Sequence, residues 1–231
     1  DGWMGVMIHS GSRNIGLQVC NYYDEKAKAL DRIWFSKVDP DINLAFLPLR
    51  TPEFKQYWTE MEYCVQFAFA NRKLMMDRIC GVIKDNVPDA EFEPMINIAH
   101  NYAAWEHHFD EDVIVHRKGA TRAREGEIGI IPGSQGTKSY ITEGLGNPDS
   151  FMSCSHGAGR VMSRTEAVRT LSLEAEQAKL DEKGIVHALR YQKDLEEAAS
   201  AYKNIEEVMA NQADLTRIVT ALEPIAVIKG V

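Results

Sequence analysis

Short apolar runs alternate along the chain with longer stretches in which apolar residues recur at helical spacing. Residues 3–9 (WMGVMIH) and 95–100 (MINIAH) are apolar runs that end in a histidine followed by polar residues, a pattern typical of short strands leading into turns. Helical spacing predicts one helix over residues 14–35 and a longer one over residues 51–87. The longer helix opens with threonine and proline, which suit the cap and the first position of a helix.

The second half of the chain mixes strand and helix patterns. Two strands, over residues 113–116 and 128–131, are predicted to form a β-hairpin around the basic, glycine-containing segment 117–124. Helices return over about residues 163–212, and residues 223–229 are predicted to close the chain as a strand. Because strands and long helices do not alternate regularly, the expected fold class is α+β.

Composition and charge limit the class of protein. The 231 residues fit one large domain or two small ones, and 45% hydrophobic with 26% charged residues is ordinary for a globular protein. The net charge of −8 argues against a nonspecific coat on nucleic acid but leaves room for a local basic groove. No run approaches the roughly 20 apolar residues of a membrane helix, so we expect no membrane association.

Cysteine usage and the first residues add two further expectations. The four cysteines, Cys20, Cys64, Cys80 and Cys154, are scattered and form no CxxC pair, which suits a reducing compartment such as the cytoplasm. The chain begins at Asp1 rather than at methionine and opens in a strand pattern, so we expect it to be part of a longer protein.

His9 and His100 share a sequence context that suits metal binding. Each is expected where a strand ends at a turn, and such positions often converge in one pocket. Neutral imidazole binds zinc, manganese or iron, but two histidines are an incomplete donor set, since a divalent ion usually has a carboxylate or thiolate ligand as well. The alternative for each histidine is an ordinary hydrogen-bonded role, and spacing alone does not decide between the two.

His156 lies in the run SCSHGAGR. The glycines that follow it remove side-chain bulk and permit positive φ, so backbone amides can approach a phosphate closely. A neutral histidine beside such a nest can attack a nucleotide phosphorus and form a phosphoramidate. The alternative is a tight turn that contains a histidine by chance.

Two further segments have chemistry that suits phosphate. Residues 132–139 (PGSQGTKS) offer backbone amides, hydroxyls and a lysine, although they do not match the GxxxxGK[ST] pattern of a P-loop. The basic run within residues 117–124 could contact a phosphodiester backbone. The alternatives are an ordinary surface turn for the first and a solvated charged face for the second.

Six motifs, in this order along nearly the whole chain, resemble those of one known family. They are IHSGSR around His9, NIAHNYA around His100, RKGATRAREGEIGIIPGSQGTKSY from Arg117, GLGN from Gly144, SCSHGAGRVMSR around His156 and the closing VIKG around Lys229. The family that they resemble is RtcB, the RNA-splicing ligases. The resemblance implies mixed strands and long helices around a central metal- and nucleotide-binding pocket, in a single catalytic domain over residues 1–231.

The resemblance also implies an activity. RtcB-like enzymes are GTP- and manganese-dependent ligases that join RNA ends carrying a 3′-phosphate or 2′,3′-cyclic phosphate to ends carrying a 5′-hydroxyl, in tRNA splicing or RNA repair. By resemblance, His156 attacks the α-phosphate of GTP and expels pyrophosphate. The guanylate then passes to the RNA 3′-phosphate, and attack by the 5′-hydroxyl releases GMP.

Roles for individual residues follow from the same resemblance. His9 and His100 are implied as ligands of a two-metal manganese site, and His156 as the nucleophile. The implied nucleotide-binding residues are His100, Asn101, Pro132, Gly133, Ser134, Gln135, Ser139, His156, Gly157, Ala158, Gly159 and Lys229. The implied RNA contacts are Arg13, Arg117, Arg122, Arg124 and Arg160.

Two family motifs have no match in this sequence. One is a DxGCG-like run whose Asp and Cys bind metal, and the other is a GNHFIE-like run with a further metal histidine. A minor departure is Asn14, where the family often has glycine. The two histidines would therefore hold only part of the metal pair, and the rest would come from an N-terminal segment. Two alternatives stay open: a metal-dependent phosphoesterase, and a truncated, non-catalytic RNA-binding module. The sequence identifies neither the physiological RNA nor a protein activator.

Overall fold

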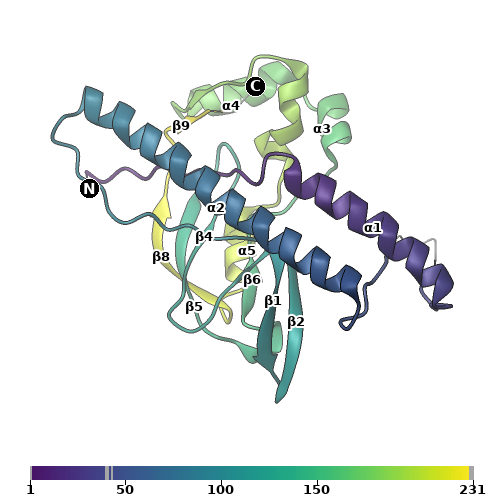
Figure 1. Cartoon of the computed structure of the whole chain (residues 1–231). Helices are drawn as coiled ribbons and strands as arrows, with labels where there is room; N and C mark the ends of the chain where they lie inside the picture. Colours follow the sequence, from purple (N-terminus) through teal and green to yellow (C-terminus); the bar gives the residue numbers. More distant parts are fainter. Residues whose placement is uncertain (1, 40–41, 43, 229–231) are drawn as a thin grey trace. The chain divides into compact units, whose positions relative to one another are not determined.

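The computed structural model of the chain describes residues 2–39, 42 and 44–228, and it contains both long helices and strands (Figure 1). The expected α+β class is thus confirmed. The chain divides into two compact units, Asp1–Tyr102 and Ala103–Val231, called unit 1 and unit 2 below. The prediction of a single catalytic domain stays a prediction, because one such domain can contain two compact units.

Unit 1 is built from two long helices, α1 (Ile15–Ile33) and α2 (Pro52–Asn86). Both helices were predicted from the sequence. Thr51 caps α2 as expected, because its side-chain oxygen accepts a hydrogen bond from the Phe54 amide at 3.2 Å. The two helices pack against each other, and the Tyr23 hydroxyl donates to Glu60 Oε1 at 3.0 Å (Figure 1).

The two strands predicted in unit 1 are wrong. Residues 2–11 and 90–99 have no regular secondary structure, and Trp3 and Met4 are exposed. An apolar run becomes a strand only when another strand supplies its hydrogen bonds, and among the described residues neither segment has such a partner. The histidines at the ends of these runs are therefore held by other contacts.

The described residues of unit 2, together with Asn101 and Tyr102 at the start of β1, form four small sheets. Strands β4, β5 and β8 form an antiparallel sheet in the order β4-β5-β8, while the other three sheets have two strands each: β1 with β2, β3 with β6, and β7 with β9 in parallel. The strands are β1 (Asn101–His108), β2 (Glu111–Lys118), β3 (Ala120–Arg122), β4 (Ile128–Ile131), β5 (Ser139–Gly144), β6 (Ser153–Ser155), β7 (Val186–His187), β8 (Thr216–Leu222) and β9 (Ala226–Val227).

The predicted hairpin of residues 113–116 with 128–131 is also wrong, although both segments are strands. β2 pairs with β1 across a tight turn in which Phe109 and Asp110 have φ of 53° and 62°, while β4 pairs with β5. The basic segment between them contains β3, which pairs with β6 about thirty residues later, as in the Thr121–Cys154 pair. Strand periodicity indicates which residues are extended, but it does not specify their partners.

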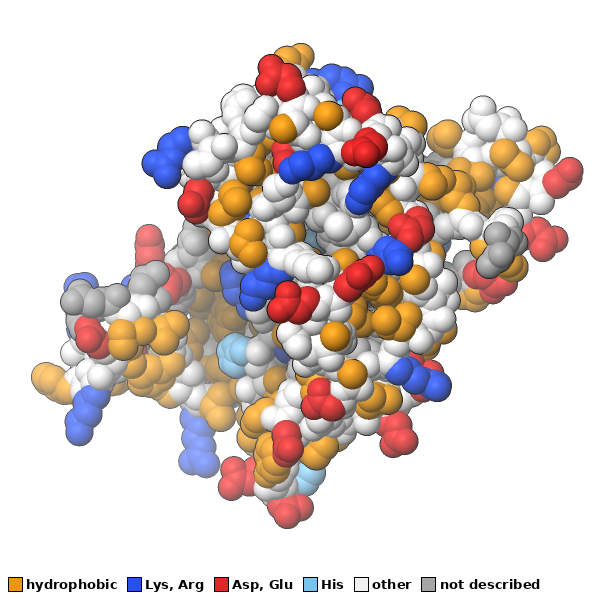
Figure 2. Space-filling model, turned by 180° about the vertical axis from the view of Figure 1, so that it is seen from behind, with side chains coloured by type: hydrophobic (Ala, Val, Ile, Leu, Met, Phe, Trp, Pro, Cys, Tyr) orange, Lys and Arg blue, Asp and Glu red, His pale blue; other side chains and the backbone are white. Residues whose placement is uncertain are grey.

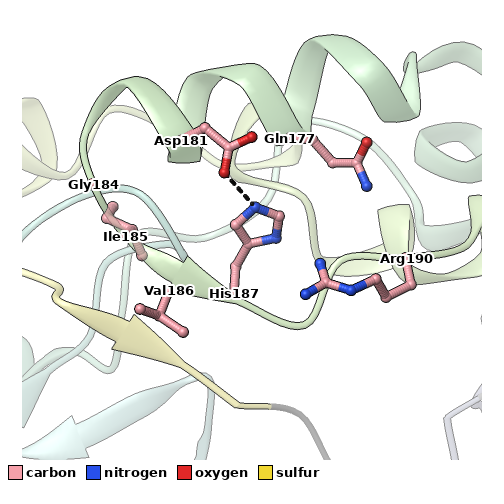
Figure 3. Close-up of a pocket in the computed structure, with 7 residues that line it drawn as sticks. All are labelled: Gln177, Asp181, Gly184, Ile185, Val186, His187 and Arg190. Atoms are coloured by element: carbon pink, nitrogen blue, oxygen red, sulfur yellow. Dashed lines mark hydrogen bonds and ion pairs between the residues drawn. The ribbon is translucent and has the colours of Figure 1, made fainter.

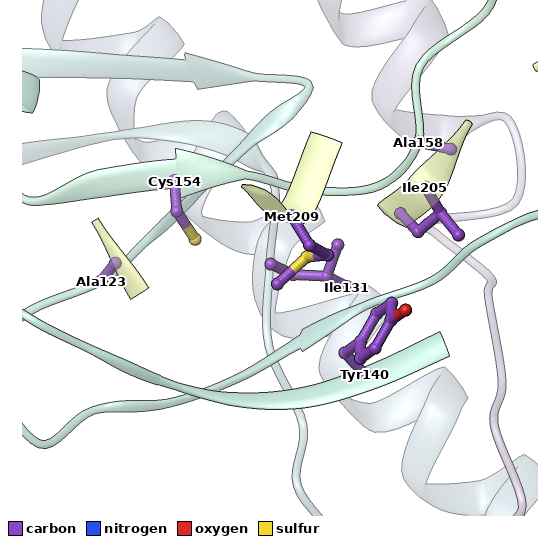
Figure 4. Packing of buried hydrophobic residues seen from close by; sticks show 7 residues of the cluster. All are labelled: Ala123, Ile131, Tyr140, Cys154, Ala158, Ile205 and Met209. Carbon is purple, nitrogen blue, oxygen red and sulfur yellow. The ribbon is translucent and has the colours of Figure 1, made fainter. Parts of the chain in front are cut away.

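One hydrophobic cluster joins the sheets of unit 2 to helix α5 (Ile205–Ala210). Ile131, Tyr140 and Met209 point toward one another in its centre (Figure 4). Cys154 and Ala158 belong to the same cluster, so the residues on both sides of His156 are anchored in the core. This packing fixes the turn that carries the histidine.

The helical region predicted over residues 163–212 consists of short elements. They are α3 (Arg164–Thr170), α4 (Leu173–Glu182), α5, and the 3-10 helices η3 (Gln192–Glu197) and η4 (Ala199–Ala201); a further 3-10 helix, η2 (Pro148–Ser150), precedes β6. A second hydrophobic cluster, centred on Leu195, packs these elements together. The closing strand is shorter than expected, since only β9 forms within residues 223–228, and Lys229 lies outside the described residues.

Candidate functional site

His9 and His100 lie side by side in unit 1, although 91 positions separate them in the sequence. Their ring centroids are 5.1 Å apart, and the rings meet edge to face at 80°. A metal-bound imidazole nitrogen lies about 2.1 Å from the ion, so two rings at this separation are compatible with binding one ion between them. Within the described residues no group of three or more His, Cys, Asp or Glu side chains could hold a metal. The fit to a metal is therefore partial.

The His156 turn in unit 2 is shaped by short backbone contacts. The amide of Ala158 donates to the Pro132 carbonyl at 3.2 Å, and the Ser155 hydroxyl donates to the Gly157 carbonyl at 2.6 Å. Gly119 has φ of +73°, and a Cβ added to it would lie 3.4 Å from His156 Cε1 and 3.5 Å from Nδ1. The ring is therefore bordered by backbone on its Nδ1 side, where the nitrogen itself is buried.

The loop of residues 132–139 lies against this turn, because the Ala158 amide of the turn donates a hydrogen bond to the Pro132 carbonyl of the loop. The sequence predicted that the backbone amides of this loop would be available to bind phosphate, but two of them have partners within the loop. The Gly133 amide donates to the Ser139 hydroxyl at 3.2 Å, and the Ser134 amide donates to the Thr137 hydroxyl at 2.7 Å. Gln135 donates its side-chain amide to the Glu197 carbonyl at 2.9 Å. These hydrogen bonds hold the loop in place. A phosphate would have to bind to the loop's hydroxyls or displace the bonds that its amides already make.

The predicted nucleotide-binding residues fall into two groups. The 132–139 loop and the His156–Gly159 turn meet in unit 2. His100 and Asn101 belong to unit 1, and Lys229 lies outside the described residues. The central pocket shared by metal and nucleotide residues stays a prediction.

Arg117, one of the predicted RNA contacts, is buried. Its guanidinium forms a two-pronged ion pair with Glu106, at 2.5 and 3.0 Å, and Glu106 also contacts His108 Nε2 at 2.9 Å. Burial alone would raise the pKa of Glu106, but the hydrogen bonds from Arg117 and His108 outweigh it and hold the pKa below its ordinary value. This arrangement makes Arg117 part of the interior and disfavours a contact with RNA.

The other predicted RNA contacts differ in exposure. Arg122 is half-buried and bonds both carboxylate oxygens of Glu127, whereas the side chains of Arg124 and Arg13 are exposed. On the face shown in Figure 2, basic and acidic side chains are interspersed rather than separated. That face does not by itself indicate a path for RNA.

Arg160 has partners that the sequence does not predict. Its guanidinium lies over the Tyr202 ring, 5.0 Å from the centroid, and it is 3.5 Å from a carboxylate oxygen of Glu197. Glu197 also binds Arg164 at 3.0 Å. These partners come from residues about forty positions later, and no local spacing pattern could have linked them to Arg160.

A cavity of about 470 Å³ lies elsewhere in unit 2, beside α4 and β7 (Figure 3). It is lined by Gln177, Asp181, residues 184–187 and Arg190. His187 has both ring nitrogens engaged: Nδ1 accepts from the Leu189 amide at 3.2 Å, so Nε2 carries the proton and donates to Asp181 at 3.2 Å. The cavity therefore has no imidazole lone pair available for attack, and it contains none of the predicted site residues.

Residues 1–230 match the family model described as tRNA-splicing ligase RtcB. The chain belongs to the RtcB family. The match spans all six motifs from which the resemblance was inferred. None of the helices within the described residues combines the length and the apolar character needed to cross a membrane.

Curated RtcB relatives come from bacteria and archaea. The chain is 38% identical over 234 residues to the RNA-splicing ligase RtcB of Escherichia coli (strain K12), a match that covers 97% of this chain and 56% of that protein. It is 35% identical over 252 residues to RNA-splicing ligase RtcB of Mycobacterium tuberculosis, covering 100% and 57%, and 34% identical over 256 residues to tRNA-splicing ligase RtcB of Thermococcus kodakarensis, covering 100% and 53%. The chain spans about half the length of the RtcB relatives that it matches.

Proposed function

We propose that the protein containing this chain is an RNA ligase that uses GTP and manganese. It joins RNA 3′-phosphate or 2′,3′-cyclic phosphate ends to 5′-hydroxyl ends through a guanylate carried on His156. Its RNA substrates belong to tRNA splicing or RNA repair, and it works in the cytoplasm. Membership of the RtcB family supports the ligase class.

The observation that carries the proposal is the setting of His156. Its turn is anchored in the core on both sides and lies against the 132–139 loop, as the bond between Ala158 and Pro132 requires. The neutral imidazole is the nucleophilic form of histidine. Because Nδ1 is buried beside Gly119, Nε2 is the nitrogen that we expect to attack.

In the proposed first step, a bond forms between Nε2 and the α-phosphorus of GTP, and the bond to pyrophosphate breaks. The imidazole loses its proton after attack. The hydroxyls of Ser134 and Ser139 are the groups of the neighbouring loop that we expect near the nucleotide, and Lys229 would add a positive charge.

Manganese would neutralise phosphate charge during this displacement. His9 and His100 would hold it in part, as their 5.1 Å ring separation permits. Because the described residues offer no third ligand of the His, Cys, Asp or Glu type, the 231-residue chain alone should bind manganese weakly.

The test is to incubate the full-length protein with Mn²⁺ and α-labelled GTP and to measure acid-labile, alkali-stable label on the protein. We expect label on the parent and none on His156→Ala. The matched control is His116→Ala, which removes an exposed histidine from β2 and should retain the label. Absence of label from a folded, manganese-loaded parent would refute the ligase mechanism and favour a phosphoesterase or an RNA-binding module.

A further inference from the structure

The two histidine-bearing segments of unit 1 lack the ladder of hydrogen bonds that a sheet would provide. Residues 2–11, which include His9, and residues 90–99, which precede His100, have no regular secondary structure. Nevertheless the two rings meet at 5.1 Å. Some other set of bonds must fix the separation of the segments.

Arg72, a buried residue of α2, forms hydrogen bonds to both segments. Its Nε donates to Asn97 Oδ1 at 2.7 Å, three residues before His100, and its Nη1 donates to the Ser10 carbonyl at 3.0 Å, directly after His9. The residue is 9% exposed. The guanidinium of Arg72 thus links the backbone next to His9 to the segment that precedes His100.

Two asparagines extend the same network. The side-chain amide of Asn71 donates to Ser10 Oγ and to the Gly11 carbonyl, both at 3.1 Å. The side-chain amide of Asn97 donates to the Phe69 carbonyl of α2 at 3.2 Å. Each histidine segment therefore has its own hydrogen bonds to α2, and Arg72 bonds to both segments.

The environment of Arg72 argues against a role in stability alone. Among the described residues its guanidinium forms no ion pair with a carboxylate, and Nη2 is buried without a hydrogen-bond partner. The face of the guanidinium lies over the Phe69 ring at 4.8 Å from the centroid. Burying a charge without a counter-ion is unfavourable, and an apolar side chain would fill this space at lower cost.

We propose that Arg72 is a positioning residue that sets the separation and orientation of His9 and His100 for metal binding. The inference rests on the proposed metal role of these two histidines. The planar guanidinium carries its donors in a fixed fork, so it can hold the Ser10 carbonyl and the Asn97 amide oxygen in one geometry. Lysine has the charge but a single ammonium on a flexible stem, and it cannot reproduce that fork.

The experiment measures metal binding in the full-length protein without GTP or RNA. Mn²⁺ affinity is followed by the loss of the free-ion EPR signal, and the ligand geometry by the visible absorption of the Co²⁺ form. The variants are Arg72→Lys and Asn71→Ala, and the matched control is Arg78→Ala, an exposed arginine on the same helix. His9→Ala identifies the part of the signal that belongs to this pair.

We expect Arg72→Lys to lower Mn²⁺ affinity about 10- to 100-fold, as for other residues that orient metal ligands, and to change the Co²⁺ spectrum. Asn71→Ala should weaken binding in the same direction while Arg78→Ala binds as the parent does. If Arg72→Lys does not fold, Asn71→Ala still tests whether this network sets the metal affinity, because it keeps the buried guanidinium and removes only the Asn71 hydrogen bonds.

The inference is overturned if Arg72→Lys binds Mn²⁺ with the affinity and Co²⁺ spectrum of the parent, or, where Arg72→Lys does not fold, if Asn71→Ala does so. It is also overturned if His9→Ala binds as the parent does, since the pair would then hold no metal. Guanylylation of His156 in the parent separates these outcomes from failure of the proposed function. A parent that takes up label while Arg72→Lys binds metal normally would retain the ligase and lose only the positioning role.

Discussion

Glu106, Arg117 and His108 form a buried polar network in unit 2. The side chains of Arg117 and Glu106 are 1% and 2% exposed, and Arg117 also donates to the Phe151 carbonyl and to the Ser153 hydroxyl, both at 3.0 Å. Ser153 begins the strand β6 that leads to His156. The network therefore links the β1–β2 sheet to the turn that carries His156. The burial of Arg117 disfavours the RNA contact that the charge pattern predicted for it.

Replacing Glu106 by glutamine should destabilise the protein by about 3–5 kcal/mol at pH 7, because Arg117 would remain buried without a counter-ion. The pKa of Glu106 is depressed in the folded state, so its stabilising effect is present above the unfolded pKa and is lost as pH falls through the folded pKa. The difference between parent and Glu106→Gln should therefore shrink below about pH 4. Urea unfolding followed by circular dichroism across this pH range measures it.

The control for this prediction is Glu111→Gln, which alters an exposed carboxylate on β2. It should unfold at nearly the same urea concentration as the parent. Equal stability of parent and Glu106→Gln at pH 7 would contradict the importance of the buried pair.

At the scale of elements, helices were predictable and strand pairing was not. The sequence predicts α1 and α2 correctly because caps and helical spacing are local, as in the bond from the Phe54 amide to Thr51. Pairings such as Tyr140 with Ala221 depend on residues about eighty positions apart. The runs before His9 and His100 contain strand-forming residues, but no strand among the described residues pairs with them.

The candidate site shows the same limit. Motifs predicted phosphate-related chemistry for His156 and the 132–139 loop from residue type and glycine content, and that chemistry stays a prediction. They could not indicate that Ser139 and Thr137 would satisfy the loop's own amides, or that Arg72 would lie between two histidine segments. Such contacts depend on tertiary packing, which no local pattern encodes.

Gly119 and Gly126 provide a test at this scale, because they share a backbone conformation and differ in surroundings. Their φ values are +73° and +74°, so alanine should cost about 1–2 kcal/mol of stability at either position. Only at Gly119 would the new methyl contact His156, 3.4 Å from Cε1. The added contact is an ordinary van der Waals one that limits motion of the ring, so we expect Gly119→Ala to slow guanylylation by less than about tenfold, or about 1.4 kcal/mol in activation free energy, relative to Gly126→Ala.

The label assay with α-labelled GTP compares the two glycine variants under conditions where both are folded. Equal rates for Gly119→Ala and Gly126→Ala would indicate that the Nδ1 side of the His156 ring can accommodate a methyl group. That result would leave the role of His156 intact and remove the steric argument for attack through Nε2.

At the scale of the whole molecule, the two units differ in how much they bury. The buried residues among those described in unit 1 are Tyr23, Ala27, Asp31, Cys64 and Arg72. Two of the five are charged, and large apolar side chains such as Phe35, at 90% exposure, face solvent. The described residues of unit 2 form two hydrophobic clusters, and strand β5 is hydrogen-bonded on both edges.

This difference predicts unequal hydrogen exchange along the 231-residue chain. Amides open more readily where few apolar side chains are buried, so α1 should exchange faster than β5. We expect the protection factors to differ by more than about tenfold, or about 1.4 kcal/mol in the free energy of local opening. Exchange followed by mass spectrometry of peptides, with an unfolded sample as reference for intrinsic rates, measures both elements at once. Protection of α1 equal to that of β5 would mean that the helical unit is as stable as the sheet unit, and burial would then fail as the explanation of stability in this chain.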